Sequence, residues 1–154
     1  MQYLLLAAII ILVIGFSGKK NKPVQYKSKL LLTKHEFWFY NSLKKVTESF
    51  GLQILAKIRL ADLVDPMPNA DRKEWYRDFA KVQSKHIDFA VCDNMKVILL
   101  IELDDKSHER TERQERDNFV NEVLSSAGYT LIRTYGETDA IKQALEEKMR
   151  SKIN

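Results

Sequence analysis

The sequence of 154 residues contains one cysteine and only five glycines. A lone cysteine, Cys92, forms no disulfide within the chain and excludes a zinc site built from several cysteines. The sequence has no glycine-rich phosphate loop, no Ser-His-Asp order and no histidine pair with zinc-ligand spacing. Hydrophobic residues make up 45% and charged residues 30%, which argues against a disordered, collagen-like or polytopic membrane protein.

Negative charge is missing from the N-terminal region. Residues 1–30 hold five lysines and no Asp or Glu. Removing these five from the 25 Lys and Arg residues leaves 20 against 21 acidic residues in 31–154. The body of the protein therefore carries about −1, although the whole chain carries +4. The basic balance belongs to the tail and does not by itself indicate a nucleic-acid-binding body.

Residues 1–18 carry no charge, and Tyr3–Phe16 is apolar apart from Gly15. As a helix these residues would span roughly 27 Å at about 1.5 Å each, near the thickness of the bilayer hydrocarbon. We expect a single transmembrane anchor at 1–18; a cleaved signal peptide and a buried helix are the alternatives. Because lysines follow the apolar run, we expect the inner (cytoplasmic) membrane, with the C-terminal domain in the cytoplasm.

Hydrophobic periodicity predicts an α/β domain at 33–154, after a basic linker at 19–32. The continuous apolar run Val97–Ile101 is typical of a central strand, and we expect a mixed sheet flanked by helices. A turn at Asp93-Asn94 joins two strands into a hairpin. We expect helices at 33–50, 72–83, 110–127 and 138–150, and strands at 52–60, 87–92, 96–104 and 129–134.

The first helix of this domain has a recognisable beginning. Thr33 and Glu36 match a capping box, in which each residue satisfies a backbone N–H of the other. We expect the apolar face of this helix to include Phe37 and Leu43. Trp38 is also expected in the core rather than as a platform for stacked bases.

Acidic residues gather at the end of the predicted hairpin. Side chains alternate along a strand, so Glu102 and Asp104 face the same way. A turn near Asn94–Met95 places Asp88 opposite Ile101 or Glu102. Clustered carboxylate oxygens suit Mg²⁺ or Mn²⁺, and such an ion activates water for attack on a phosphodiester. The alternative is that these are solvated acidic residues at strand ends.

Three residues that follow the hairpin complete a candidate site. His108 can act as a base or as an acid for the leaving group near neutral pH, or it is simply a surface histidine. Arg113 and Arg116 lie on the next helix and are placed to contact backbone phosphates. The alternative is a solvated helix in which these arginines pair with neighbouring acidic residues.

Asp88 followed by Glu102-Leu103-Asp104 resembles the PD-(D/E)XK superfamily, whose members have the restriction-endonuclease-like fold. The resemblance covers about residues 31–135. It is closer to the very-short-patch-repair-endonuclease-like proteins and to a neighbouring uncharacterised bacterial domain family. The segments that carry it are Ile101–His108, Arg116-Asp117, Gly128, Leu131–Arg133, Lys57–Asp62 and Lys85–Phe89.

The resemblance implies a restriction-endonuclease-like mixed sheet with a site for Mg²⁺ or Mn²⁺. Asp88 and Glu102 would be metal ligands, and the Leu103 carbonyl would add a third oxygen. His108 would lie near the attacking water, and Glu36 would be an accessory acidic residue. No small-molecule cofactor is implied.

One position departs from the superfamily pattern. Asp104 stands where the superfamily has a lysine that activates water and neutralises charge. Either Lys85, Lys106 or His108 replaces that lysine, or Asp104 is another metal ligand. The two lysines are also candidates, with the arginines, for contacting DNA. We therefore expect a membrane-anchored, metal-dependent endodeoxyribonuclease. The alternative is a catalytically inactive module of the same fold that binds nucleic acid or a protein at the membrane.

Overall fold

The computed structural model describes residues 24–68, 71–104 and 111–152, and within this range it leaves out the side chains of 111–113. The chain divides into two units, Met1–Leu30 and Leu31–Asn154. In the first unit, residues 24–30 are described and have no helix or strand. No helix among the described residues is long and apolar enough to cross a membrane, and the predicted anchor at 1–18 lies outside them.

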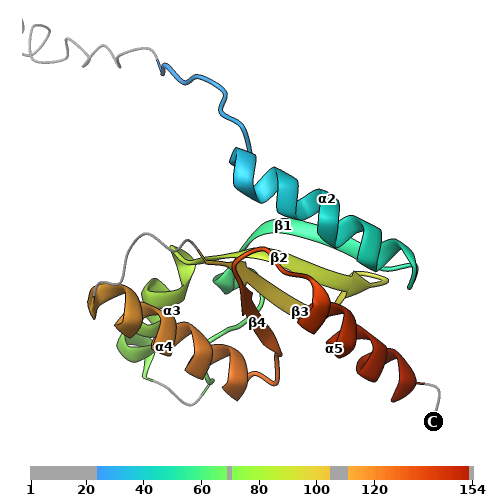
Figure 1. The fold of residues 1–154 in the computed structure, drawn as a ribbon. Coiled ribbons are helices and arrows are strands. Elements are labelled where there is room, and N and C mark those ends of the chain that lie inside the picture. Colours follow the sequence, from blue (N-terminus) through green and yellow to red (C-terminus); the bar gives the residue numbers. More distant parts are fainter. Residues whose placement is uncertain (1–23, 69–70, 105–110, 153–154) are drawn as a thin grey trace, which may run out of the picture. The chain divides into compact units, whose positions relative to one another are not determined.

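The second unit is an α/β domain with four α-helices among its described residues (Figure 1). Its helices are α2 (Lys34–Glu48), α3 (Arg72–Gln83), α4 (Thr111–Ser126) and α5 (Asp139–Arg150), with a 3₁₀ turn η1 (Leu60–Asp62). Its strands are β1 (Gln53–Arg59), β2 (His86–Asp93), β3 (Lys96–Leu103) and β4 (Leu131–Thr134).

The strands form one mixed sheet in the order β1-β2-β3-β4. The first three strands are antiparallel, and β4 runs parallel to β3. The predicted hairpin is confirmed, and Asn94 and Met95 at its turn have φ of 47° and 66°. Positive φ at two adjacent turn residues is typical of the tight turns that join antiparallel strands. The predicted α/β class and mixed sheet are also confirmed.

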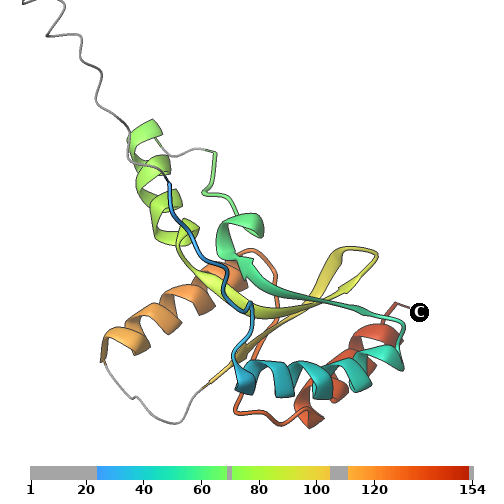
Figure 2. The same ribbon diagram turned by 90° about the horizontal axis from the view of Figure 1, so that it is seen from above.

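Helices cover both faces of the sheet (Figures 1 and 2). On one face α2 and α5 contribute Phe39, Leu43, Ile141 and Leu145 to a core with the alternate residues Phe89, Val91, Leu99 and Ile101. On the other face α3 and α4 contribute Val82, Val120 and Leu124 to a second core with Ala90, Cys92 and Leu100. The central strands β2 and β3 are therefore buried on both sides, as their continuous apolar sequences predict.

The buried face of α2 differs from the expected one. The capping box is confirmed, since Thr33 N donates to Glu36 and Glu36 N donates to Thr33. However, Phe37 and Trp38 are 54% and 70% exposed, so their expected burial is wrong. The buried stripe runs through Phe39 and Leu43, because the Phe39 ring packs on Phe89 of β2 with centroids 5.4 Å apart.

Candidate carboxylate site

Four charged residues occupy neighbouring positions across the four strands; we call them the charged row. Ala56 pairs with Phe89 and Ile58 with Ile87, so Lys57 of β1 lies opposite Asp88 of β2. Phe89 pairs with Ile101, so the next position brings Asp88 beside Glu102 of β3. Glu102 in turn pairs with Arg133 of β4. The row thus reads Lys57, Asp88, Glu102, Arg133, with two carboxylates between two cations.

Lys57 has an unusual backbone conformation for a strand residue. Its φ is +56°, in the left-handed region that non-glycine residues rarely adopt. Ala56 packs in the core under α2 and α5, whereas Ile58 packs in the core under α3 and α4. In a regular strand both residues would face the same way. The face that β1 presents to the helices therefore changes at the level of the charged row, and β2 changes in the same way between its paired residues Ile87 and Phe89.

The Lys57 ammonium group joins two carboxylates from different elements. Its Nζ lies 2.5 Å from Glu36 Oε1 and 2.7 Å from Asp88 Oδ1. The capping box holds Glu36 at the first turn of α2, since its other oxygen accepts a hydrogen bond from Thr33 N at 2.7 Å. Asp88 Oδ2 accepts a hydrogen bond from Leu103 N at 3.1 Å. Both oxygens of Asp88 are therefore engaged and its orientation is fixed.

This pairing favours the charged forms of Glu36 and Lys57. Burial alone would raise the pKa of Glu36, but hydrogen bonds from Lys57 and Thr33 lower it below its ordinary value. Burial alone would lower the pKa of Lys57, but hydrogen bonds to Asp88 and Glu36 raise it. The Lys57 side therefore holds an ammonium and carboxylates that stabilise one another.

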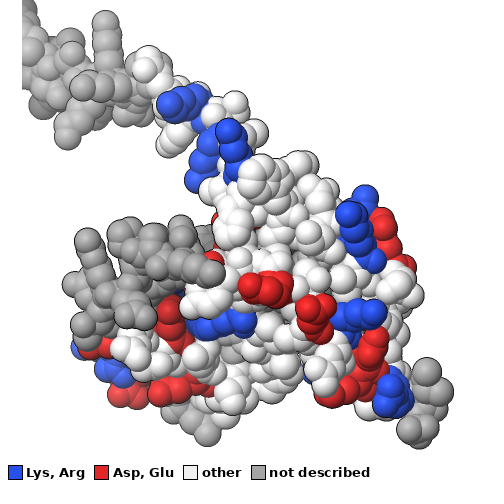
Figure 3. All heavy atoms as spheres, viewed as in Figure 1, with Lys and Arg blue, Asp and Glu red and all other residues white. Residues whose placement is uncertain are grey.

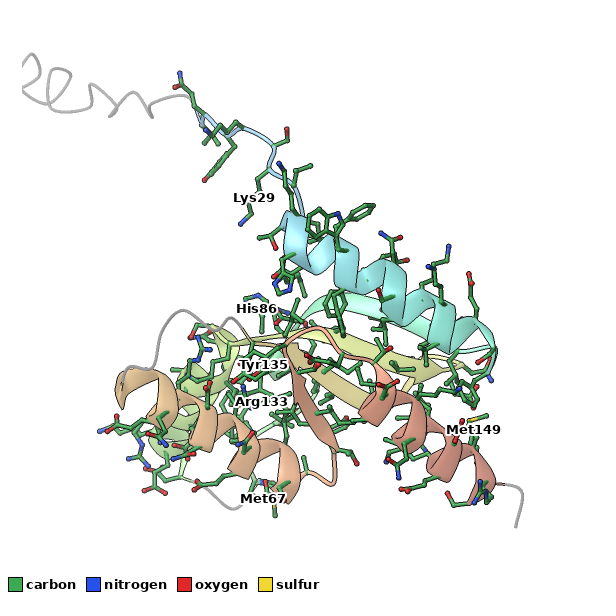
Figure 4. The ribbon with its side chains drawn as sticks, in the orientation of Figure 1. Lys29, Met67, His86, Arg133, Tyr135 and Met149 are labelled. Carbon is green, nitrogen blue, oxygen red and sulfur yellow. The ribbon has the colours of Figure 1, made fainter. Side chains whose placement is uncertain are left out.

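Arg133 occupies the other end of the row and extends from β4 on the side of α4 (Figure 4). Its guanidinium forms an ion pair with Glu102, and Nη1 lies 3.8 Å from Asp104 Oδ1 and 3.7 Å from Asp117 Oδ1. Nη2 donates a hydrogen bond to Asn121 Oδ1 of α4 at 3.3 Å. Glu102 and Asp104 therefore face the same side, as their alternation along the strand predicts, and they share one cation with a carboxylate of α4.

Glu102 is the buried acid of the row, with 9% of its surface exposed. Burial raises its pKa above the ordinary value, and the negative charges of Asp88 and Asp117 add to this effect. Arg133 opposes the shift without cancelling it. A buried acid beside another carboxylate is a favourable place for an additional cation.

The three predicted catalytic carboxylates do not converge on one point. Asp88 and Glu102 are neighbours in the sheet, but Asp88 is held by Lys57, and Asp104 lies beside Arg133. Within residues 24–68, 71–104 and 111–152, no three carboxylate, histidine or cysteine side chains are grouped closely enough to hold a metal ion. The predicted third ligand, Leu103, ends β3 and contacts Asp88 through its backbone N–H.

The predicted DNA contacts are only partly described. Lys85 precedes β2, and its ammonium lies 5.1 Å from the centre of the Phe119 ring of α4. Arg116 is exposed on α4 and lies 3.4 Å from Asp117, a contact of the kind described by the alternative of a solvated, self-paired helix. The side chain of Arg113 and all of Lys106 and His108 lie outside the described residues.

Sequence reasoning missed the roles of Lys57 and Arg133. A signal was present, because each is a cation inside a short apolar strand, in Ile54–Ile58 and Leu131–Thr134. A charge in such a position needs a partner of opposite sign. The identity of the partner depends on strand register, which one sequence does not give.

The described surface seen in Figure 3 carries charges of both signs. On the described part of the face in Figure 3, acidic and basic side chains are interspersed and no broad area of one sign is present. A hollow of about 390 Å³ lies beside Arg133, between α4 and the edge strand β4. It is lined by Asn121, Leu124, Ser125, Tyr129, Leu131 and Arg133.

Comparison with known proteins gives a family for the chain. No curated protein and no solved structure is significantly similar to the sequence. One family, described as a protein of unknown function (DUF2726), matches residues 28–153, and this match covers every element of the sheet and both helical layers. The chain therefore belongs to the DUF2726 family.

Proposed function

We propose that the chain is a membrane-anchored, divalent-metal-dependent nuclease-like domain that hydrolyses DNA phosphodiesters. The observation that carries the proposal is the placement of Asp88 and Glu102 side by side on the two central strands. Burial and the charge of Asp88 raise the pKa of Glu102, so the pair favours an added cation. The order of helix, strand, hairpin, helix and parallel strand supports a restriction-endonuclease-like fold.

The donor chemistry of this pair fits Mg²⁺ or Mn²⁺. These ions prefer carboxylate oxygens, and Mg²⁺ is commonly held by one or two carboxylates together with water and substrate phosphate. Asp88 and Glu102 would hold the ion, with the Leu103 carbonyl as a further donor. When bound, such an ion polarises a phosphodiester and lowers the pKa of a bound water.

The surrounding residues orient these carboxylates. Leu103 N and Lys57 fix the two oxygens of Asp88, and Arg133 holds Glu102 against β4. Asp104 and Asp117 share the guanidinium of Arg133, so Arg133 stays in place if Glu102 turns toward a bound ion. Arg116, Lys85 and the undescribed Arg113, Lys106 and His108 remain candidates for contact with DNA or the attacking water.

The site is tested with the full chain purified in detergent and incubated with labelled duplex, branched and single-stranded DNA. We expect cleavage that requires Mg²⁺ or Mn²⁺. Glu102→Gln should lower the rate at least about 100-fold, because it removes a metal ligand. Glu146→Gln, an exposed glutamate on α5, is the matched control. Absence of cleavage on all three DNA forms, or cleavage that survives Glu102→Gln, would reject the proposal.

We also propose that residues 1–18 anchor the domain in the inner (cytoplasmic) membrane by a single span, with the C-terminal domain in the cytoplasm. The uncharged run followed by five lysines supports this orientation. Cell fractionation tests it: the chain should stay in the membrane pellet after an alkaline wash, and external protease should not digest the domain in spheroplasts. Recovery of a shortened chain in the soluble fraction would indicate a cleaved signal peptide instead.

A second candidate is a catalytically inactive module that binds nucleic acid or a protein at the membrane. It is favoured by Asp104 at the position of the superfamily lysine and by the engagement of Asp88 and Glu102 with two internal cations. Calorimetry separates the candidates. DNA binding without saturable binding of Mn²⁺ would support the inactive module.

A further inference from the structure

Lys57 has a backbone conformation that lysine rarely adopts. Its φ of +56° lies in the left-handed region, which glycine and asparagine adopt more readily than lysine. The residue sits in the middle of β1, between paired residues on both sides. Strained conformations of this kind persist where the surrounding structure enforces them, and they cluster at functional sites.

The Lys57 side chain contacts two other elements of the fold. The ammonium is held at 2.5 Å and 2.7 Å by Glu36 and Asp88, which come from α2 and β2. The side chain is 26% exposed, so part of it is accessible to solvent. An ammonium has three N–H donors, and among the described residues two of them are used. Within that part of the chain, one donor is left for a ligand.

A negatively charged phosphodiester that binds beside these carboxylates needs a positively charged donor nearby. Glu36, Asp88 and Glu102 are negative, and without nearby positive charge they repel a DNA phosphate. Asp104 adds another acid where the superfamily pattern has a lysine. Arg133 is shared among Glu102, Asp104 and Asp117, so it is already the counterion of three carboxylates. Lys57 is the cation that contacts Asp88 directly and is still partly exposed.

We propose that Lys57 supplies, from β1, the ammonium group that contacts a non-bridging oxygen of the DNA phosphate bound at Asp88 and Glu102. The inference rests on the proposed nuclease function, and it assigns to Lys57 the role of the cation that contacts the substrate phosphate. Glu36 is then a positioning residue, since the helix cap holds it where it directs Lys57. Contact with the phosphate neutralises charge that develops in the transition state.

The test compares the full chain with Lys57→Met and Lys57→Arg. Single-turnover cleavage of the labelled DNA panel and calorimetric binding of Mn²⁺ are measured for each. We expect Lys57→Met to cleave at least about 100-fold more slowly, and Lys57→Arg to recover about tenfold of that loss. Binding of Mn²⁺ should persist or become tighter in Lys57→Met, because a cation that competes for Asp88 is gone. This readout separates phosphate contact from a structural role.

Two further variants control for folding. Lys57→Gly removes the ammonium and accepts the left-handed backbone, so it should fold and be as slow as Lys57→Met. Lys81→Met removes an exposed lysine of α3 that also pairs with an aspartate, Asp78 at 2.8 Å, and should cleave at the normal rate.

The outcomes are distinguishable. Cleavage by Lys57→Met and Lys57→Gly within about threefold of the unsubstituted chain would overturn the role of Lys57 alone. Joint loss of cleavage and Mn²⁺ binding in both variants would also overturn it, because it would indicate a structural role. If the unsubstituted chain neither cleaves DNA nor binds Mn²⁺, both the proposed function and this inference are rejected.

Discussion

The glutamates at the two ends of the charged row have pKa values shifted in opposite directions. At the Lys57 end one ammonium serves Glu36 and Asp88, and the pKa of Glu36 falls below its ordinary value. At the Arg133 end one guanidinium lies among Glu102, Asp104 and Asp117, and the pKa of Glu102 stays above its ordinary value. Ion pairs alone therefore do not decide how an acid titrates.

Burial explains the difference between the two ends. Glu102 lies on the central strand β3 with 9% of its surface exposed, so loss of hydration is the largest influence on its pKa. Glu36 lies at a helix N-terminus, where backbone and side-chain donors compensate for burial. At the Lys57 end hydrogen bonds outweigh the effect of burial on the pKa of Glu36, and at the Arg133 end the ion pair does not outweigh it for Glu102.

The largest effect on stability should follow removal of Arg133. Arg133→Met leaves Glu102 buried beside two other carboxylates without its nearest cation, and should lower the free energy of unfolding by about 3 kcal/mol at neutral pH. Urea unfolding of the full chain, followed by tryptophan fluorescence, measures this loss. A change below about 1 kcal/mol would mean that Glu102 is already satisfied without Arg133.

Removal of the Lys57 ammonium should have a smaller effect, because that end of the row is more exposed. We expect Lys57→Met to lower the free energy of unfolding by about 2 kcal/mol. Lys57→Gly should lose about 1 kcal/mol less, since glycine relieves the left-handed backbone. The same urea experiment compares them. Equal losses in the two variants would show that the backbone at this position is not strained.

The two acids should give stability changes of opposite sign with pH. The folded-state pKa of Glu102 is raised, so its contribution is complete below its unfolded pKa and is lost as pH rises through the folded value. The folded-state pKa of Glu36 is lowered, so its contribution is present above the unfolded pKa and is lost as pH falls through the folded value. The free energy of unfolding of the native chain, measured relative to Glu102→Gln, should therefore decrease as pH rises. Measured relative to Glu36→Gln, it should decrease as pH falls.

Urea unfolding midpoints measured between about pH 3 and pH 7 test these two pH dependences. Both changes in stability begin near the ordinary pKa of glutamate, about 4.3. Gln keeps the capping ability of Glu36, so the variant isolates its charge. If the stability difference between native chain and variant changed with pH in the same direction for Glu102→Gln and Glu36→Gln, the two ends of the row would not differ as described.

The smallest effect is expected for an ion pair outside the row. Lys44 and Glu48 are 3.5 Å apart on the exposed face of α2. Lys44→Met should change the free energy of unfolding by less than about 0.5 kcal/mol, and added salt should reduce the change further. If Lys44→Met lost as much stability as Lys57→Met, burial would not explain the difference in stability expected between exposed and partly buried ion pairs.

Much of this fold is readable from the sequence. Continuous apolar runs predict β2 and β3, the capping box predicts the start of α2, and Asp93-Asn94 predicts the hairpin turn. Alternation along β3 places Glu102 and Asp104 on one side, and hairpin register brings Asp88 near them. These features are local, so one sequence is enough to predict them.

Other features depend on tertiary contacts. The rotation of α2 that buries Phe39 and exposes Phe37 is set by the Phe89 ring of β2, from a distant part of the chain. The left-handed conformation of Lys57 has no sequence signal, because lysine does not favour it and its enforcing partners are 21 and 31 residues away. The partners of Arg133 depend on its pairing with β3 and its contact with α4.

We propose that Asp88 and Glu102 together form a site for a divalent cation. Calorimetric titration of the full chain with Mn²⁺, beside Asp88→Asn, tests it most directly. We expect saturable binding that is lost in Asp88→Asn, since the variant keeps the shape of residue 88 but not its charge. Absence of saturable binding in the unsubstituted chain, or unchanged binding in Asp88→Asn, would contradict it.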